Sequence, residues 1–303
     1  RRKKLRRAMR IGIDLGGTKI EAIALDEDGS VLLRERIAAP RGDYAATVDA
    51  IASLVGNIEQ RLQRKGTVGV GMPGTISPAT GLVKNANSTW INGRAFADDL
   101  PRRLDRAVRF ANDANCFTLS EATDGAAAGV NLVFGVILGT GVGGGIAVRG
   151  QVLNGCNGIA GEWGHNPLPW PERGEWPGPS CYCGRSGCIE TFLSGPGLTR
   201  DYVNAGGNEV AAVEIANRVE RGDPQAKASL DRYVDRLARP LASVINVLDP
   251  DAIVLGGGMS NVEMLYSAVP AQWSRFVFSD RVDTRLLRAA HGDSSGVRGA
   301  AWL

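Results

Sequence analysis

Three of the five cysteines and one of the two histidines of this 303-residue chain fall within one stretch, residues 161–190. The histidine comes first and the cysteines follow: His165, Cys181, Cys183 and Cys188. Three thiolates and one imidazole make the closed tetrahedral set that is typical of structural zinc. A disulfide, or buried cysteines beside a hydrogen-bonded histidine, is the alternative, although cysteines one residue apart are poorly spaced to bridge each other. The pattern predicts a zinc site.

Acidic residues stand at positions where they could take part in catalysis. Glu162 and Glu190 flank the cysteine cluster. Asp113 follows Asn112 at the end of an expected strand and ahead of an expected helix. There it could cap the helix, or it could accept a proton from a substrate hydroxyl. Asp14 ends the first expected strand and suits either water-mediated contact with Mg²⁺ or ordinary turn chemistry.

Two glycine-rich turns, residues 15–19 and 139–145, could bind phosphate through backbone N–H groups that a side chain would otherwise block. Either turn alone reads as an ordinary hairpin, but their matching positions in a repeated unit predict a triphosphate site. The second turn also fits the Gly-x-Gly-x-x-Gly dinucleotide pattern. That pattern requires a helix to begin in the turn, and residues 146–150 are too short and too β-branched to supply one.

The elements that must position these residues alternate between strand and helix. Period-two and short apolar runs predict strands at 10–14, 20–25, 31–37, 68–72, 108–110, 132–138, 146–148 and 252–255. Apolar spacing of three and four predicts helices at 44–64, 213–221 and 226–248, with Pro240 kinking or splitting the last. Two further helices are expected. One follows Asp113 and runs through residues 121–128, and a short one lies near the end of the chain, where Ser294 or Ser295 could be the cap. A strand, a glycine turn and a second strand occur twice, about 120 residues apart, which predicts two similar α/β lobes facing each other across a cleft.

Composition places the chain among ordinary globular proteins, with 44% hydrophobic and 22% charged residues. The formal net charge is +3, but the first ten residues carry seven Lys/Arg and no acid, so the rest carries 3 − 7 = −4. We expect residues 1–9 to lie outside the fold, either as sequence upstream of Met9 or as a nucleic-acid arm. No apolar run approaches the roughly 18 residues of a membrane span, and no signal sequence is evident. A cytoplasmic location, where thiols stay reduced, is expected.

Taken in order, these motifs resemble the ROK family of sugar kinases, from about residue 10 to the end. The matching segments are residues 14–19, 112–113, 139–141, 161–165, 181–190 and 256–258. Within the family the chain is similar to bacterial fructokinases of the manno(fructo)kinase type, through residues 85–90, 161–170 and 292–303. The resemblance implies a two-lobed actin-like ATPase (ribonuclease H-like) fold. The expected lobes are residues 10–122, with a C-terminal helix at about 291–303 packing back on them, and residues 123–290, which hold the zinc knuckle.

The resemblance also implies a role for each site residue. Zinc would be bound by His165, Cys181, Cys183 and Cys188. The sugar would be bound by Asn112, Asp113, Glu162, His165 and Glu190, with Asp113 as the catalytic base. ATP, with Mg²⁺, would be bound by Asp14, Leu15, Gly16, Gly17, Thr18, Lys19, Ile20 and Glu21, by Gly139, Thr140, Gly141, Val142, Gly143, Gly144, Gly145 and Ile146, and by Gly256, Gly257, Gly258 and Met259.

The expected reaction is transfer of phosphate from ATP to the 6-hydroxyl of fructose, and also of mannose. Glucose and N-acetylmannosamine are alternative substrates within the same family. A non-catalytic sugar-sensing regulator is a more distant alternative, since family repressors carry a helix-turn-helix ahead of the residue equivalent to Asp14 and only thirteen residues precede it here. The segment between His165 and Cys181 is longer than in glucokinase-type members, which leaves the shape of the sugar pocket open. A homodimer that binds neither nucleic acid nor membrane is expected.

Overall fold

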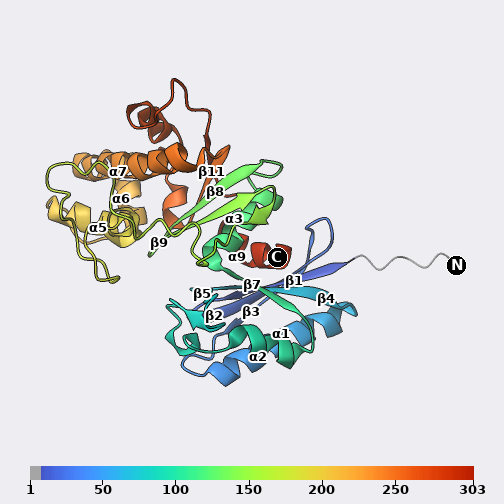
Figure 1. Cartoon of the computed structure of the whole chain (residues 1–303). Helices are drawn as coiled ribbons and strands as arrows, with labels where there is room; N and C mark the ends of the chain where they lie inside the picture. The colour runs from blue at the N-terminus through green and yellow to red at the C-terminus, as the bar shows by residue number, and fades with distance from the viewer. Residues whose placement is uncertain (1–7) are drawn as a thin grey trace. The chain divides into compact units, whose positions relative to one another are not determined.

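A computed structural model describes residues 8–303, which form two compact units (Figure 1). Of the described residues, unit one contains 8–128, Gly150–Ala160 and Asp293–Leu303; unit two contains Gly129–Arg149 and Gly161–Gly292. The basic run at residues 1–7 lies outside the described residues. Met9 is already the buried first residue of strand β1, one position before the expected start.

The main sheet of unit one has the strand order β3-β2-β1-β4-β7. Its strands are β1 (Met9–Leu15), β2 (Lys19–Leu25), β3 (Val31–Ala38), β4 (Gly66–Met72) and β7 (Val108–Asn112). The first three are antiparallel, as their tight turns predict, whereas β1, β4 and β7 run parallel. One short pair and a single short strand complete the strands of this unit: β5 (Thr75–Ile76) pairs with β6 (Val83–Lys84), and β10 is Gln151–Val152.

Helices α1 (Tyr44–Leu62) and α2 (Phe96–Leu104) cover one face of this sheet (Figure 1). Helix α1 begins where the side chain of Asp43 accepts a hydrogen bond from the Ala46 amide, an N-cap. Its buried Val48, Ile51 and Ile58 recur at helical spacing and pack into the same core as the strands. The predicted helix and the observed one therefore share the same apolar face.

Helices α3 (Asp113–Thr123) and α9 (Ser295–Trp302) cover the opposite face (Figure 1). They approach so closely that a Cβ added at Gly299 would lie 1.6 Å from the carbonyl oxygen of Cys116. Only glycine fits there, so backbone packs directly on backbone. Buried polar contacts join the same elements: Ser295 Oγ donates to Glu121 Oε1 at 2.8 Å, and Arg298 pairs with Asp124.

Unit two repeats the pattern of an antiparallel pair followed by parallel strands. Strands β9 (Val142–Val148), β8 (Leu132–Leu138), β11 (Ala252–Gly256) and β12 (Arg285–Arg288) are neighbours in that order. Strands β8 and β9 form the hairpin, and β8, β11 and β12 are parallel. The helices are α4 (Ile189–Leu193), α5 (Gly195–Asn204), α6 (Ala212–Glu220), α7 (Pro224–Leu248) and α8 (Leu265–Ala268).

Two helix predictions need correction. Helix α3 ends at Thr123, and residues 124–128 are turns, because Gly125 packs against Glu121 and follows an irregular C-cap at Asp124. Helix α7 is a single element that runs through Pro240 instead of splitting there. Buried neighbours on both sides of this proline, Ala238 and Leu241 among them, hold the helix in place against the local cost of the missing donor. Among residues 8–303, no helix combines the length and the apolar character of a membrane span.

Candidate functional site

The predicted metal ligands come together in unit two. One ligand atom from each of His165, Cys181, Cys183 and Cys188 lies within 4.8 Å of the other three. Cys181 Sγ is 3.5 Å from His165 Nδ1, and Cys183 Sγ is 3.6 Å from Cys188 Sγ. Zinc bound tetrahedrally at about 2.3 Å from sulfur and about 2.0 Å from nitrogen would place two sulfurs about 3.8 Å apart and a sulfur and a nitrogen about 3.5 Å apart. The geometry therefore fits zinc.

The knuckle is shaped by its backbone. Gly184 and Gly187 have φ values of 86° and 70°, in the left-handed region that favours glycine. The amide of Gly184 donates to the carbonyl of Cys181 at 3.0 Å, which closes the turn between the first and second cysteines. Burial and two neighbouring thiols raise the pKa of Cys188 to about 12, so a cation is needed to hold it as a thiolate. All of the cysteines are free, so the disulfide alternative is excluded for this structure.

The two ring nitrogens of His165 have different partners. Nδ1 faces Cys181, while Nε2 lies 2.9 Å from the hydroxyl of Tyr182. The rings of His165 and Tyr182 meet edge to face at 5.1 Å. Tyr182 therefore fixes the orientation of the imidazole ring from the side opposite the sulfurs. The sequence interpretation did not single out Tyr182, although its place between two ligating cysteines is a signal that could have done so.

Glu162 and Glu190, which flank the cysteine cluster, lie in different environments. Glu190, in the first turn of α4, accepts a hydrogen bond at Oε2 from the amide of Val142 at 2.9 Å, and its own amide donates to the carbonyl of Gly164. Glu162 is exposed, next to Trp163. Trp163 anchors the segment, because its ring packs edge to face on Phe134 and its Nε1 donates to the carbonyl of Gly143 at 3.0 Å.

Unit one holds the other predicted catalytic residues at one edge of its sheet. Asp14 and Asn112 lie near the carboxyl ends of the parallel strands β1 and β7, where α/β proteins commonly bind ligands. Asn112, and not Asp113, is the N-cap of α3: its Oδ1 accepts from the Ala114 amide at 2.9 Å, and its Nδ2 donates to the carbonyl of Gly74. Asp113 is the first residue of the helix. Burial first, and then the carboxylates of Asp113 and Glu21, raise the pKa of Asp14 to about 6.

A cavity of about 220 Å³ lies beside this edge and is lined by Asn112, Met72, Phe110 and Asn154 among others. Asn154 is also 3.5 Å from the side-chain nitrogen of Asn115 on α3. Two amide side chains on an apolar wall suit a ligand with several hydroxyls. Neither Asn154 nor Asn115 was identified from the sequence, where each looks like an ordinary polar residue.

The turn at residues 14–21 is a tight hairpin between β1 and β2, in which the Gly16 amide donates to the carbonyl of Lys19 at 3.0 Å. Glu21 is buried, and its carboxylate pairs with Arg34 and Arg36 on β3. Those hydrogen bonds hold the pKa of Glu21 below its usual value in spite of burial, which acts to raise it. The side chain of Glu21 is thus committed to the sheet.

A larger cavity, of about 1110 Å³, lies within unit two and brings together two of the predicted nucleotide segments. Gly139 and Thr140 come from the turn after β8, and Gly258 and Met259 from the segment after β11. The opposite wall is formed by α5, by the connection that follows it and by the start of α6. The residues are Gly195, Pro196, Thr199, Arg200 and Val203 on α5, Glu209, Val210 and Ala211 in the connection, and Ala212 and Val213 on α6. A cavity of this size holds a nucleotide-sized ligand.

A model of the ROK family matches residues 10–303. The chain belongs to the ROK family. It is 41% identical to an N-acetyl-D-glucosamine kinase of Photobacterium profundum, over 97% of this chain and 99% of that protein. The structure of a ROK hexokinase from Thermus thermophilus matches with a TM-score of 0.86 at 30% identity, over 97% of each chain. A ROK family glucokinase from Streptomyces griseus, solved in complex with glucose and AMPPNP, matches with a TM-score of 0.76 at 27% identity, over 97% of this chain and 98% of that one.

The predicted fold class is therefore confirmed: this ROK protein has two mixed α/β lobes of the actin-like ATPase fold. It is an ATP-dependent sugar kinase, with a sugar and ATP as its substrates. The His/Cys cluster agrees with a zinc site in this kinase. The α5 wall of the large cavity was not predicted, because Gly195–Asn204 opens with Gly-Pro-Gly, which favours a turn, and residues 209–211 lie in an irregular connection ahead of α6.

Proposed function

We propose that this kinase transfers phosphate from ATP to the 6-hydroxyl of N-acetylglucosamine. The observation that carries the proposal is the 41% identity, along nearly the whole of both chains, to an N-acetyl-D-glucosamine kinase. The resemblance at residues 85–90 and 161–170 favours fructose, and mannose with it, as the second candidate. Both proposals use the same set of residues and differ only in the sugar.

In the proposed mechanism Asp113 accepts the proton of the 6-hydroxyl as that oxygen attacks the γ-phosphorus, and ADP leaves with the electrons of the broken bond. Asn112 positions this base by capping α3, and its second Nδ2 hydrogen is available to the sugar. Asp14 would bind Mg²⁺ through water as a carboxylate, the form that exists above its pKa of about 6.

In unit two, the proposed sugar ligands are Glu162, His165 and Glu190. Glu190 would use Oε1, since Oε2 accepts from Val142. His165 would use Nε2, because Nδ1 faces the sulfurs, and a sugar hydroxyl would take the place of the Tyr182 hydroxyl at that nitrogen. Bound zinc would supply no chemistry to the phosphate; it would hold the imidazole and the knuckle in place.

The triphosphate is proposed to bind the segments at residues 14–21 and 139–146, with the nucleoside in the large cavity beside residues 256–259. The second turn is shorter than predicted, because residues 142–146 already belong to β9. The amides of Gly139 and Val142 already donate within the protein. The donors proposed for phosphate on the second turn are therefore the hydroxyl and amide of Thr140 and the amide of Gly141.

A coupled ADP-release assay across N-acetylglucosamine, fructose, mannose, glucose and N-acetylmannosamine tests the proposal. We expect N-acetylglucosamine to have the highest kcat/KM and 6-deoxy-N-acetylglucosamine to release no ADP. A higher kcat/KM for fructose would favour the second candidate, and turnover of the 6-deoxy sugar would contradict the assigned hydroxyl. Metal analysis of the purified protein tests the zinc site independently, with one zinc per chain expected.

A further inference from the structure

The segment between the first and second metal ligands, residues 166–180, is called the insert here. It contains no helix and no strand, only turns and isolated bridges. Its two arms are hydrogen-bonded to the segment that carries Cys188: the Leu168 amide donates to the carbonyl of Gly187 at 2.9 Å, and the Gly187 amide donates to the carbonyl of Pro179 at 2.9 Å. The position of the insert therefore affects the position of the knuckle.

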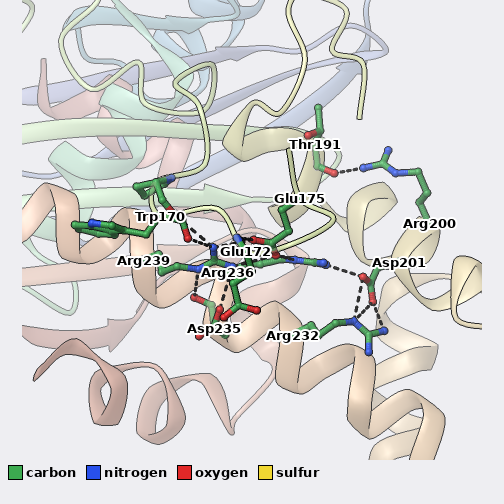
Figure 2. Close-up of polar contacts among 11 residues, drawn as sticks. Trp170, Glu172, Glu175, Thr191, Arg200, Asp201, Arg232, Asp235, Arg236 and Arg239 are labelled. Carbon is green, nitrogen blue, oxygen red and sulfur yellow. Dashed lines mark hydrogen bonds and ion pairs between the residues drawn. The ribbon is translucent and has the colours of Figure 1, made fainter. Parts of the chain in front are cut away.

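The middle of the insert is held by a buried ionic cluster on α7 (Figure 2). Glu175 is only 7% exposed. Its carboxylate accepts from Arg236 Nε at 2.7 Å, from Arg239 Nη1 at 2.8 Å and from Arg239 Nη2 at 3.1 Å. It also accepts from the amide of Glu172 at 2.8 Å, which closes the insert on itself.

Arg239 binds the insert at a second point. It is 1% exposed, and its Nη1 also donates to the carbonyl of Trp170 at 2.8 Å, while its Nη2 pairs with Asp235 at 2.9 Å (Figure 2). The ring of Trp170 stacks on Phe276 at 5.3 Å. One guanidinium thus connects two points of an irregular segment to a long helix, with the bidentate geometry that arginine provides.

The cluster extends to α5. Arg236 Nη1 pairs with Asp201 at 2.6 Å, and Arg232 Nη2 pairs with the same carboxylate at 2.6 Å (Figure 2). Buried ion pairs contribute little net stability compared with apolar residues of similar volume, because both charges lose their water. Their directional hydrogen bonds instead fix the position of the segments that they join. Here they fix the insert, which lies between the predicted metal ligands His165 and Cys181.

We propose that Glu175 is a positioning residue of this kinase: with Arg236 and Arg239 it holds the insert so that His165 and the three cysteines stand ready for zinc. The inference rests on the proposed zinc site. Without the ion pairs of Glu175 the insert would sample other positions. His165 and the cysteines would then have to become ordered as zinc binds. Zinc would then dissociate faster, and the sugar would bind less tightly through a poorly aimed His165.

The test compares Glu175→Gln with Glu172→Gln in the full-length protein. Glu172 is an exposed glutamate on the same insert whose side chain does not contact the arginines in the described structure, so it is a matched control. The release of zinc to a colorimetric chelator is followed over time, without sugar or ATP. We expect Glu175→Gln to release zinc about tenfold faster, at the lower end of the effect seen when residues that orient metal ligands are changed. Glu172→Gln should match the parent.

Glu175→Asp provides a second variant that keeps the charge and shortens the side chain by one methylene. It should fold, release zinc at an intermediate rate, and raise the KM for the sugar while leaving the KM for ATP unchanged. If Glu175→Gln does not fold, Glu175→Asp decides alone. Parental zinc release in the folded Glu175 variants, or equally fast release in Glu172→Gln, would overturn the proposal. Absence of zinc from the parent would show, before any variant is compared, that the zinc site itself is wrong.

Discussion

Replacement of Asp113 by asparagine should separate catalysis from folding. The cap of α3 belongs to Asn112, whose Oδ1 accepts from the Ala114 amide at 2.9 Å. Asp113 Oδ1 accepts from the same amide at 2.8 Å, and an asparagine oxygen can do so too. Asparagine also loses the favourable interaction of a negative charge with the helix N-terminus, about 0.3–1 kcal/mol. We therefore expect Asp113→Asn to unfold within about 1 kcal/mol of the parent.

Turnover should fall far more than stability. Loss of a general base costs about 10²–10⁴ in rate, which at about 1.36 kcal/mol per factor of ten is about 2.7–5.4 kcal/mol of transition-state stabilisation. We expect kcat to fall by this factor in the ADP-release assay, with little change in the KM for ATP. Asp43→Asn is the control, because it makes the same change at the N-cap of α1. A kcat for Asp113→Asn within tenfold of the parent would refute the role of base.

The same variant should change the titration of Asp14. Asp113 is the second cause, after burial, of the pKa of about 6 at Asp14. Because that pKa is raised in the folded state, the stability linked to protonated Asp14 is present below about pH 4 and lost as the pH rises towards 6. In Asp113→Asn the pKa of Asp14 should fall, so less stability is lost over this range. Urea unfolding between pH 4 and 7 measures this loss of stability. The same pH dependence in the parent and in Asp113→Asn would contradict the electrostatic coupling of Asp113 and Asp14.

The remaining predictions concern packing at Gly299, the hydrogen bond between Tyr182 and His165, and the charge of Glu175. Gly299→Ala should destabilise unit one by about 3 kcal/mol or more in urea unfolding, because its Cβ would overlap the carbonyl of Cys116. Gly296→Ala, on the same helix, is the control. No atom would lie nearer than 4.0 Å to its Cβ, so this variant should be neutral or slightly stabilising. Tyr182→Phe should lower the KM for the sugar about threefold to tenfold, since the sugar would no longer have to displace one hydrogen bond of about 1 kcal/mol from His165 Nε2. An unchanged KM would contradict that displacement. Hydrogen bonds from Arg239 and Arg236 hold the pKa of Glu175 at about 2, against burial and below the usual 4.5. Stability of about 3 kcal/mol should therefore be present above pH 4.5 and lost as the pH falls towards 2, a loss that Glu175→Gln should not show in acid unfolding.

Local patterns predicted much of the fold and the metal ligands. The apolar spacing of α1 and the tight turns of β1, β2 and β3 depend on neighbouring residues, so they are visible in the sequence. The same holds for the ligating cysteines, which lie within eight residues of one another. The spacing was enough to predict the His/Cys cluster, because a zinc site requires few residues, of few types.

The features that were missed depend on contacts between distant residues. Arg236 and Arg239 of α7 look like a solvated helix face, and only the fold reveals Glu175 as their partner. The wall of the large cavity comes from α5 and residues 209–213, whose sequence carries no phosphate or adenine motif. Helix α7 continues through Pro240 because packing on both sides compensates for a local preference that favours a break.

Glu190 connects the metal site to the proposed phosphate turn. It comes two residues after Cys188, its amide donates to the carbonyl of Gly164, and its carboxylate accepts from the amide of Val142 at the end of the glycine turn. A glycine turn has few side chains to hold it, so this bond is one of the contacts that set its conformation. A displacement of the knuckle would therefore also move the turn. If the proposed sites are correct, zinc would affect both substrates of the kinase: the sugar through His165, and ATP through the carboxylate of Glu190.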